Sequence, residues 1–247
     1  MKFQRKSRLL GRAELVWFEA GAGHPVVSLH PAAGLQIRAV ANALAEGRRV
    51  ILPIVPGYEA TPYVDGMNTI PEVADLFAEL ISLECPQTPD VVGHSMGARL
   101  ASWMIVRHPD VARRLVLMAP SGFRPLDAPP LSFEPAVFLQ QLYAHPERRP
   151  PETRSPEELE ANRRAFRHYG VGNPRDEALD AKIHQIACPT LLVGGGKDVR
   201  VPPESIHYLH RKISGSRAIF IDDAAHAIEV DQPEQTSAQV LAFLDAA

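Results

Sequence analysis

The sequence predicts an α/β fold, in which helices cover both faces of a mostly parallel sheet and a helical insertion precedes the last two strands. Short apolar segments typical of strands alternate with segments of helical periodicity along most of the chain. A proline-rich segment at 121–186 interrupts this alternation and contains only helical patterns. The length of 247 residues is enough for one α/β domain with a small insertion.

The expected strands share a short apolar core that stops at glycine, proline or a polar loop. In chain order they are Glu14–Phe18, Pro25–His30, Arg49–Ile54, Val91–Val92, Leu115–Met118, Thr190–Val193 and Ala218–Ile221. Strands that are joined by helices run parallel, because the crossover returns the chain to the same end of the sheet.

The expected helices show apolar residues at spacings of three and four. They are Leu35–Glu46, Pro71–Leu83, Gly97–Arg107, Ser205–Ile213 and Glu234–Leu244. Gly47 follows the first of them, as is typical of helix ends. Each helix lies between two expected strands or follows the last one, which gives the alternation that a doubly covered sheet requires.

The insertion carries two helical patterns, near Glu134–Ala144 and Pro156–Tyr169. We therefore predict a core formed by residues 1–121 and 186–247, and a helical cap formed by residues 122–185. Bulky residues of the first pattern either pack the cap onto the core or line an acyl pocket; they are Phe133, Phe138, Leu139, Leu142 and Tyr143. Phe138 and Leu142 are the candidates for contact with a substrate.

The composition excludes several classes of protein. Hydrophobic residues make up 45% of the chain, which argues against disorder. Twenty-six basic against 29 acidic residues give a net charge of −3, which argues against a nucleic-acid partner. Cys85 and Cys188 are too far apart for a metal motif and too few for a disulfide framework.

No apolar run approaches the ~18 residues of a membrane span. The basic segment MKFQRKSRLLGR at the start is not followed by an apolar stretch, so it does not read as a secretory signal. We expect its basic residues on a solvated edge and the protein in the cytoplasm, with a small-molecule partner. The sequence leaves the oligomeric state open.

The motif Gly93-His94-Ser95-Met96-Gly97 lies between an expected strand and an expected helix. A serine placed there must take a sharp, strained turn that lifts its hydroxyl above the sheet. Glycine two places on either side lets the strand and helix backbones pass closely. Ser95 is therefore a candidate nucleophile; the alternative is a simple helix N-cap.

A nucleophilic serine needs a base, and the base needs an orienting acid. Asp198 follows the strand Thr190–Val193, and His226 follows the strand Ala218–Ile221. Because catalytic groups gather at the carboxyl ends of parallel strands, we expect Asp198 and His226 near Ser95. Asp222 and Asp223 are rivals for the acid, but they stand very close to His226 in sequence.

At these residues the sequence resembles the α/β-hydrolase superfamily, whose chain order is serine, acid, histidine. The resemblance extends from about Glu14 to Leu244. Ser28-Leu29-His30-Pro31-Ala32 looks like the family's His-Gly loop, and Pro56-Gly57-Tyr58 looks like its Pro-Gly-aromatic turn. The resemblance implies that the backbone N–H groups of Met96 and Ala32 form the oxyanion hole. The sequence departs from the family at Pro31, Glu59 and Ala225, where glycine is usual or common, and at Val55, where an acidic residue is frequent.

The resemblance implies a serine hydrolase that cleaves a carboxylic ester or related acyl bond through an acyl-enzyme on Ser95. One alternative keeps the three residues but cleaves a carbon–carbon bond in a dienone-type acid. Another is a ligand-binding, receptor-like protein with little turnover. The reacting groups all lie outside 122–185, so the cap should govern which substrate is accepted and the core whether chemistry occurs.

The remaining motifs point away from cofactors. The histidines lack the H-E-x-x-H and H-x-x-E-H spacings of zinc sites, and no glycine run matches a phosphate or dinucleotide loop, so we expect no metal and no cofactor. His30 and His94 flank the expected site, and each has either a structural role or a role in proton transfer. His30 is also a candidate for substrate binding. The cap arginines form either a salt-bridged exposed surface or a contact for an anionic substrate; they are Arg148, Arg149, Arg154, Arg163, Arg164 and Arg167.

Overall fold

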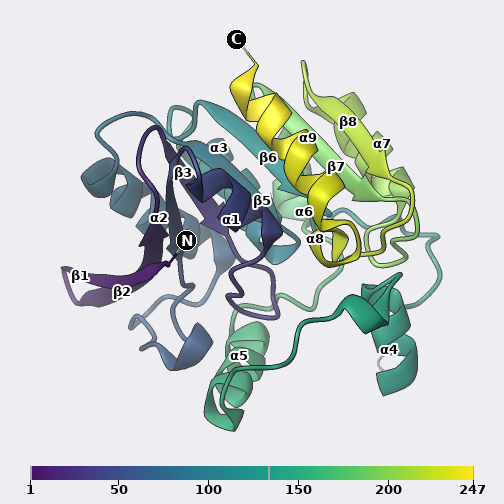
Figure 1. Cartoon of the computed structure of the whole chain (residues 1–247), viewed down its shortest axis with the longest axis horizontal. Helices are drawn as coiled ribbons and strands as arrows, with labels where there is room; N and C mark the ends of the chain where they lie inside the picture. The colour runs from purple at the N-terminus through teal and green to yellow at the C-terminus, as the bar shows by residue number, and fades with distance from the viewer. Residues whose placement is uncertain (1, 133, 247) are drawn as a thin grey trace.

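A single sheet runs through the part of the chain that the computed structural model describes, residues 2–132 and 134–246 (Figure 1). Its strands lie in the order β1-β2-β4-β3-β5-β6-β7-β8. They are β1 (Gln4–Leu10), β2 (Ala13–Ala20), β3 (Pro25–Leu29), β4 (Arg49–Pro53), β5 (Asp90–His94), β6 (Arg114–Met118), β7 (Thr190–Gly195) and β8 (Arg217–Ile221). All pairs from β4 to β8 are parallel, and β1 and β2 form an antiparallel edge. The predicted α/β fold class is confirmed.

Strand β1 is absent from the strands expected from the sequence. Its side chains are exposed along nearly its whole length, and its residues read QRKSRLL. A strand that buries neither face has no apolar alternation to reveal it, and charged residues on an edge strand discourage pairing with other chains. The basic N-terminal segment therefore lies on an exposed edge of the sheet.

Helices cover both faces of the sheet. Figure 1 shows α1 (Ala39–Ala45) and α9 (Pro233–Asp245) side by side in front of the sheet, and α2 (Ile70–Glu84) packs against α3 (Met96–Arg107). The remaining core helices are α7 (Pro203–Lys212) and the short α8 (Ile228–Asp231). Within the described residues, no helix has the length and hydropathy that crossing a bilayer requires.

One expected helix is shorter in the structure. Helical spacing predicts a start at Leu35, but α1 begins at Ala39. The Leu35 N–H donates to the carboxylate of Glu59 at 2.7 Å. Residues 35–38 therefore form a loop that is fixed by a contact from a distant part of the chain.

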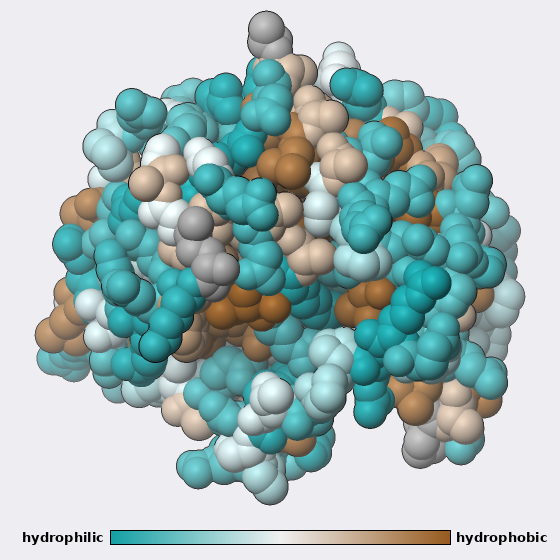
Figure 2. Space-filling model, viewed as in Figure 1, coloured by the Kyte–Doolittle hydropathy of each residue, from teal (hydrophilic) through white to brown (hydrophobic). Residues whose placement is uncertain are grey.

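The insertion between β6 and β7 contains α4 (Pro135–Leu142), α5 (Pro156–His168) and α6 (Glu177–Asp180), with short 3₁₀ turns η2 (Pro146–Arg148) and η3 (Ile183–Gln185). Phe123, near its start, pairs in a bridge with Arg175, which comes just before α6. Asp176, directly before α6, ties the insertion to α3, because its carboxylate accepts hydrogen bonds from Arg99 at 2.7 Å and from Trp103 at 2.9 Å. Figure 2 shows the surface hollowed between α5 and α4, with apolar residues beside the hollow. The cap boundaries of 122–185 stay a prediction.

The sheet edge offers a test of stability. Glu19 of β2 pairs with Arg49 at 2.9 Å and with Lys6 at 3.0 Å. Burial alone would raise the pKa of Glu19, but hydrogen bonds from Arg49, Lys6 and Trp17 outweigh it and lower the pKa from 4.5 to about 2. A carboxylate with a depressed pKa stabilises the fold above its unfolded pKa and loses that effect as the pH falls.

We therefore expect Glu19→Gln to lower the free energy of unfolding at pH 7 by about 1 kcal/mol, because solvent screens part of the charge. The difference from the wild type should shrink as the pH falls from 4.5 towards about 2. Urea unfolding at a series of pH values measures it. Glu14→Gln, at an exposed position of the same strand, is the control and should change little. An equal loss at all pH values would contradict the assignment.

Candidate active site

Ser95 stands at the turn between β5 and α3. Its backbone has φ 54° and ψ −111°, a strained conformation for a residue with a side chain. Two backbone hydrogen bonds hold it: Ser95 N–H donates to the Met118 carbonyl at 2.9 Å, and Ser121 N–H donates to the Ser95 carbonyl at 3.2 Å. The turn presents the hydroxyl at the carboxyl edge of the sheet, next to the first N–H groups of α3.

The two glycines of the motif are required by close packing. A β-carbon on Gly93 would lie 2.5 Å from the carbonyl oxygen of Gly97, and one on Gly97 would collide with the carbonyl oxygen of Leu29 in β3. Strands β3 and β5 and helix α3 therefore meet at distances that only glycine allows.

Three polar side chains from separate loops meet at this turn. The Ser95 hydroxyl lies 2.8 Å from Nε2 of His226, and Nδ1 of His226 lies 2.8 Å from a carboxylate oxygen of Asp198. All three residues are buried. The structure thus brings together the serine, the histidine and the acid named from the sequence, in the geometry of a nucleophile, a base and an orienting group.

The loop after β7 fixes Asp198. One carboxylate oxygen accepts the N–H groups of Arg200 at 2.8 Å and Val201 at 2.9 Å, which leaves the other oxygen for His226. The rival Asp223 is half-exposed and pairs instead with Lys197 at 2.6 Å and His145 at 2.7 Å. The contacts therefore favour Asp198 as the orienting acid.

The loop that carries His226 is held from two sides. Ala225 N–H donates to the carboxylate of Asp231, and Ala227 N–H donates to the carbonyl of Leu142 at the end of α4, both at 2.8 Å. Asp231 is fully buried and also accepts the N–H groups of Ala144 and His145. Sequence reasoning missed Asp231, because nothing in its neighbourhood distinguishes it from an exposed carboxylate.

His94 and His30 both act on backbone groups. His94 Nε2 lies 2.8 Å from the His226 carbonyl, and burial lowers the pKa of His94 to about 3, so the ring is neutral and donates this hydrogen bond. His30 accepts the N–H of Val55 at Nε2, and its Nδ1 lies 2.8 Å from the Pro31 carbonyl. Burial lowers the pKa of His30 to about 4. Both ring nitrogens of His30 are thus engaged by backbone, and its predicted contact with substrate stays a prediction.

The two predicted oxyanion donors lie at the start of α3 and after β3. Met96 is the first residue of α3, and Ala32 lies in a turn closed by a 3.0 Å hydrogen bond from Gly34 N–H to the Pro31 carbonyl. Among the hydrogen bonds of the described residues, the N–H groups of Met96 and Ala32 donate to no protein acceptor. Both are therefore available to an oxygen atom of a substrate.

The predicted wall residues lie on α4. The guanidinium of Arg200, from the loop of Asp198, lies 4.9 Å from the centre of the Phe138 ring. Leu142 lies at the end of α4, where its carbonyl holds the loop of His226. Helix α4 therefore contacts the loops of both partners of Ser95. Phe133, also named from the sequence, lies outside the described residues.

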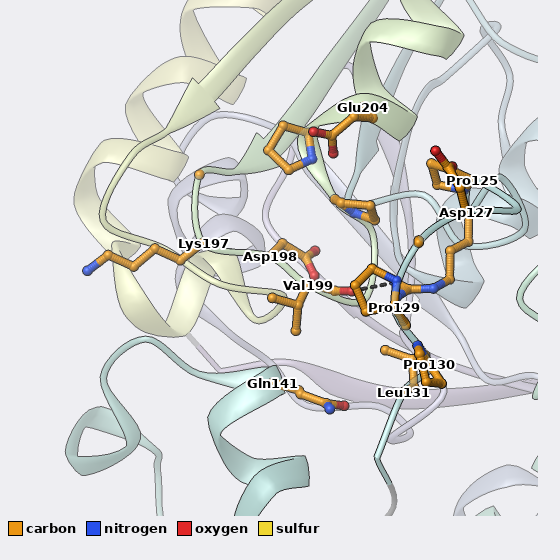
Figure 3. A pocket seen from close by; sticks show the side chains of 15 residues that line it. Pro125, Asp127, Pro129, Pro130, Leu131, Gln141, Lys197, Asp198, Val199 and Glu204 are labelled. Atoms are coloured by element: carbon orange, nitrogen blue, oxygen red, sulfur yellow. Dashed lines mark hydrogen bonds between the residues drawn. The ribbon is translucent and has the colours of Figure 1, made fainter.

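A cavity of about 620 Å³ lies beside the loop of Asp198 (Figure 3). Its walls come from the proline-rich start of the insertion, including Pro129 and Pro130, and from Val199 and Glu204. Asp198 is one of the described residues that line it, but neither Ser95 nor His226 is among them, so the cavity lies on the far side of Asp198 from the nucleophile and the base. Within residues 2–132 and 134–246, no group of three or more His, Cys, Asp or Glu residues is placed to hold a metal ion.

Residues 21–239 match the model of the alpha/beta hydrolase family. A pimeloyl-[acyl-carrier protein] methyl ester esterase of Neisseria meningitidis serogroup B is 30% identical over 215 residues, which cover 77% of this chain and 80% of that protein. The match to a serogroup A protein of the same name covers 66% of that protein. A 2-hydroxymuconate semialdehyde hydrolase of Pseudomonas is 37% identical over 112 residues, or 42% of this chain and 39% of that protein.

Solved structures share the fold. A serine hydrolase involved in carbazole degradation superposes with a TM-score of 0.81 at 23% identity, over 98% of this chain and 99% of that one. An esterase from Exiguobacterium antarcticum superposes with a TM-score of 0.75 at 21% identity, over 94% and 96% of the two chains. The family model matches most of the length of the chain, and a curated relative is 30% identical to it. The chain therefore belongs to the alpha/beta hydrolase family and is a hydrolytic enzyme.

Proposed function

We propose that this enzyme hydrolyses carboxylic esters of small organic acids through an acyl-enzyme on Ser95. The observation that carries the proposal is the pair of 2.8 Å hydrogen bonds that joins Ser95, His226 and Asp198. The esterase names of the relatives support it, since several of them are methyl ester esterases.

Acylation begins when the Ser95 hydroxyl attacks the ester carbonyl and Nε2 of His226 takes its proton. Asp198 keeps the proton of the imidazole on Nδ1 and stabilises the charged ring that forms. The carbonyl oxygen becomes an oxyanion and accepts hydrogen bonds from the N–H groups of Met96 and Ala32, of which one is worth ~3–4 kcal/mol. The N-terminal end of α3 adds a favourable dipole.

The tetrahedral intermediate collapses when its bond to the alkoxide breaks and His226 returns the proton to the leaving alcohol. Ser95 then carries the acyl group as an ester. Water attacks this ester while His226 again accepts a proton, and a second collapse releases the acid and restores the Ser95 hydroxyl. Each proton that His226 takes is given back within the same half-reaction.

The contacts of the cap arginines do not favour the carbon–carbon hydrolase. Arg163 and Arg167 pair with Glu160, Arg154 pairs with Glu152, and Arg148 donates to the Asp231 carbonyl. Arg163 and Arg167 thus form exposed ion pairs, and the other two arginines are engaged by groups of the protein. We therefore infer that the substrate carries no carboxylate that an arginine of the cap must bind, and that its acyl chain lies against the apolar residues of α4.

A panel of substrates tests the proposal. We expect turnover of p-nitrophenyl acetate and butyrate and of methyl esters, and far slower turnover of dienone-type acids. Faster cleavage of the dienone acids would establish the carbon–carbon hydrolase instead. Tight binding of these compounds without turnover, measured by calorimetry, would establish a receptor-like protein.

The wall assigned to Phe138 gives a second test. Phe138→Ala should shift the preference from acetate towards longer acyl esters, because removing the ring leaves more room beside the apolar wall of α4. Each methylene in such a pocket is worth ~1–3 kcal/mol, so the ratio of kcat/KM values should move by about 10–200-fold at most. Val137→Ala, at a neighbouring exposed position of α4, is the matched control. An unchanged preference and an unchanged KM in folded Phe138→Ala would remove Phe138 from the pocket.

A further inference from the structure

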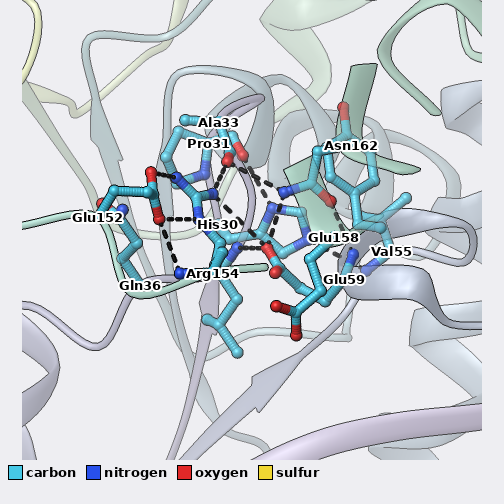
Figure 4. Close-up of polar contacts among 12 residues, drawn as sticks. His30, Pro31, Ala33, Gln36, Val55, Glu59, Glu152, Arg154, Glu158 and Asn162 are labelled. Atoms are coloured by element: carbon cyan, nitrogen blue, oxygen red, sulfur yellow. Dashed lines mark hydrogen bonds and ion pairs between the residues drawn. The ribbon is translucent and has the colours of Figure 1, made fainter. Parts of the chain in front are cut away.

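The side chain of Asn162, on α5 of the insertion, lies between two loops of the core (Figure 4). Its Nδ2 donates to the carbonyl of Ala33 at 3.2 Å and to the carboxylate of Glu59 at 3.0 Å. Its Oδ1 accepts the Glu59 N–H at 2.7 Å. Asn162 is 5% exposed, so these hydrogen bonds form away from water, where an unmade one is costly.

Glu59 extends this contact to the loop after β3. Its carboxylate accepts the Leu35 N–H at 2.7 Å while it accepts from Asn162. The backbone of Glu59 is left-handed, with φ 49° and ψ 37°, a conformation that favours glycine. The hydrogen bonds of the side chain with Leu35 and Asn162, and that of its N–H with Asn162, offset this strain.

Gly34 lies directly under this network. A β-carbon at Gly34, whose φ is +95°, would collide with the Glu59 carboxylate and with Nδ2 of Asn162. Arg154, which is held by Glu152, also donates to the Ala33 carbonyl. Asn162 and Arg154 of the insertion therefore bind the Ala33 carbonyl, and Glu59 of the core binds the Leu35 N–H.

The opposite end of the same turn is held from the core. The Pro31 carbonyl accepts hydrogen bonds from His30 Nδ1 at 2.8 Å and from Gly34 N–H at 3.0 Å. This carbonyl shares one planar trans peptide unit with the N–H of Ala32, so fixing the C=O fixes the direction of the N–H. Because Gly34 N–H is one of these two donors, a displacement of Ala33–Leu35 also turns the Ala32 N–H.

We propose that Asn162, together with Glu59, is a positioning residue for the oxyanion donor Ala32. The inference rests on the proposed function, since it assumes that Ala32 stabilises an oxyanion formed at Ser95. It makes the insertion part of the machinery that accelerates the reaction. The cap then does more than select the substrate.

The test is the kinetics of Asn162→Ala and Asn162→Asp. Asn162→Asp keeps the size and the Oδ1 acceptor but puts a carboxylate oxygen against the Ala33 carbonyl and the Glu59 carboxylate, so it breaks the same two contacts and is the second test variant. We expect kcat to fall by about 10–100-fold, because a misplaced donor costs less than a missing one. The loss should be equal for p-nitrophenyl acetate and butyrate, with KM within about two-fold of the wild type.

A transition-state analogue separates positioning from mere stability. A trifluoromethyl ketone that adds to Ser95 forms an oxyanion, so its Ki should rise by the same factor by which kcat falls. Glu59→Gln keeps an oxygen acceptor for Leu35 and should retain most activity, whereas Glu59→Ala should resemble Asn162→Ala. Arg163→Ala, on the exposed side of α5, should leave neutral-ester turnover unchanged.

Unchanged kcat and Ki in folded Asn162→Ala or Asn162→Asp would overturn the inference. A change confined to KM or to chain-length preference would also overturn it and would make Asn162 a wall of the pocket. Failure of the proposed function looks different, because then the wild type lacks ester turnover or Ser95→Ala keeps it.

Discussion

Ser95→Ala should lower kcat for p-nitrophenyl butyrate by about a million-fold, which is the scale of loss when a serine nucleophile is removed. The hydroxyl is the atom that forms the covalent bond to the acyl group, and alanine offers no substitute. The fold should be unaffected, because the backbone of residue 95 is held by the Met118 carbonyl and the Ser121 N–H and not by its side chain. Thermal unfolding followed by circular dichroism checks this.

Covalent labelling with a fluorophosphonate tests the assignment of Ser95 as the nucleophile without measuring turnover. A fluorophosphonate should add to Ser95 alone, and mass mapping of the modified peptide identifies the site. Ser121 is a matched control, because it lies next to Ser95 in space and its hydroxyl is buried without a hydrogen-bond partner among the described residues. Label on Ser121 or another serine, or full activity in Ser95→Ala, would remove Ser95 as the nucleophile.

Asp198→Asn should lower kcat by about 10⁴-fold. An amide at this position can donate to Nδ1 of His226, which would place the imidazole proton on Nε2, and that nitrogen could then not accept the proton of Ser95. The oxygen that accepts the N–H groups of Arg200 and Val201 can persist in asparagine, so we expect the loop to keep its shape. Burst kinetics should show that acylation itself is slowed.

The rival carboxylates provide the controls for this experiment. Asp223→Asn should have a small effect, because Asp223 is half-exposed and pairs with Lys197 and His145. Asp222→Asn should behave in the same way. If either change does more damage than Asp198→Asn in a folded protein, the acid is assigned to the wrong residue.

Local patterns were enough to predict the central sheet. Strands β5 and β6 are buried and short, and their apolar residues stand out between polar loops. Strand β1 could not be predicted in this way, because exposed side chains leave no period in the sequence. The start of α1 was also missed, since residues 35–38 lie in a loop that Glu59, distant in the chain, contacts through the Leu35 N–H.

The sequence by itself identified the α/β fold and named Ser95, Asp198 and His226 as one candidate site. It could do so because a strand–turn–helix motif and the carboxyl ends of parallel strands are local features with a known place in such a sheet. Only the tertiary structure decided which groups hold that site in place. Asp231 and Asn162 act through hydrogen bonds to backbone atoms that are distant in sequence, such as the Ala33 carbonyl and the Ala144 N–H. Every residue has the same backbone carbonyl, and every residue except proline has the same N–H, so a sequence carries no trace of which side chain will reach it.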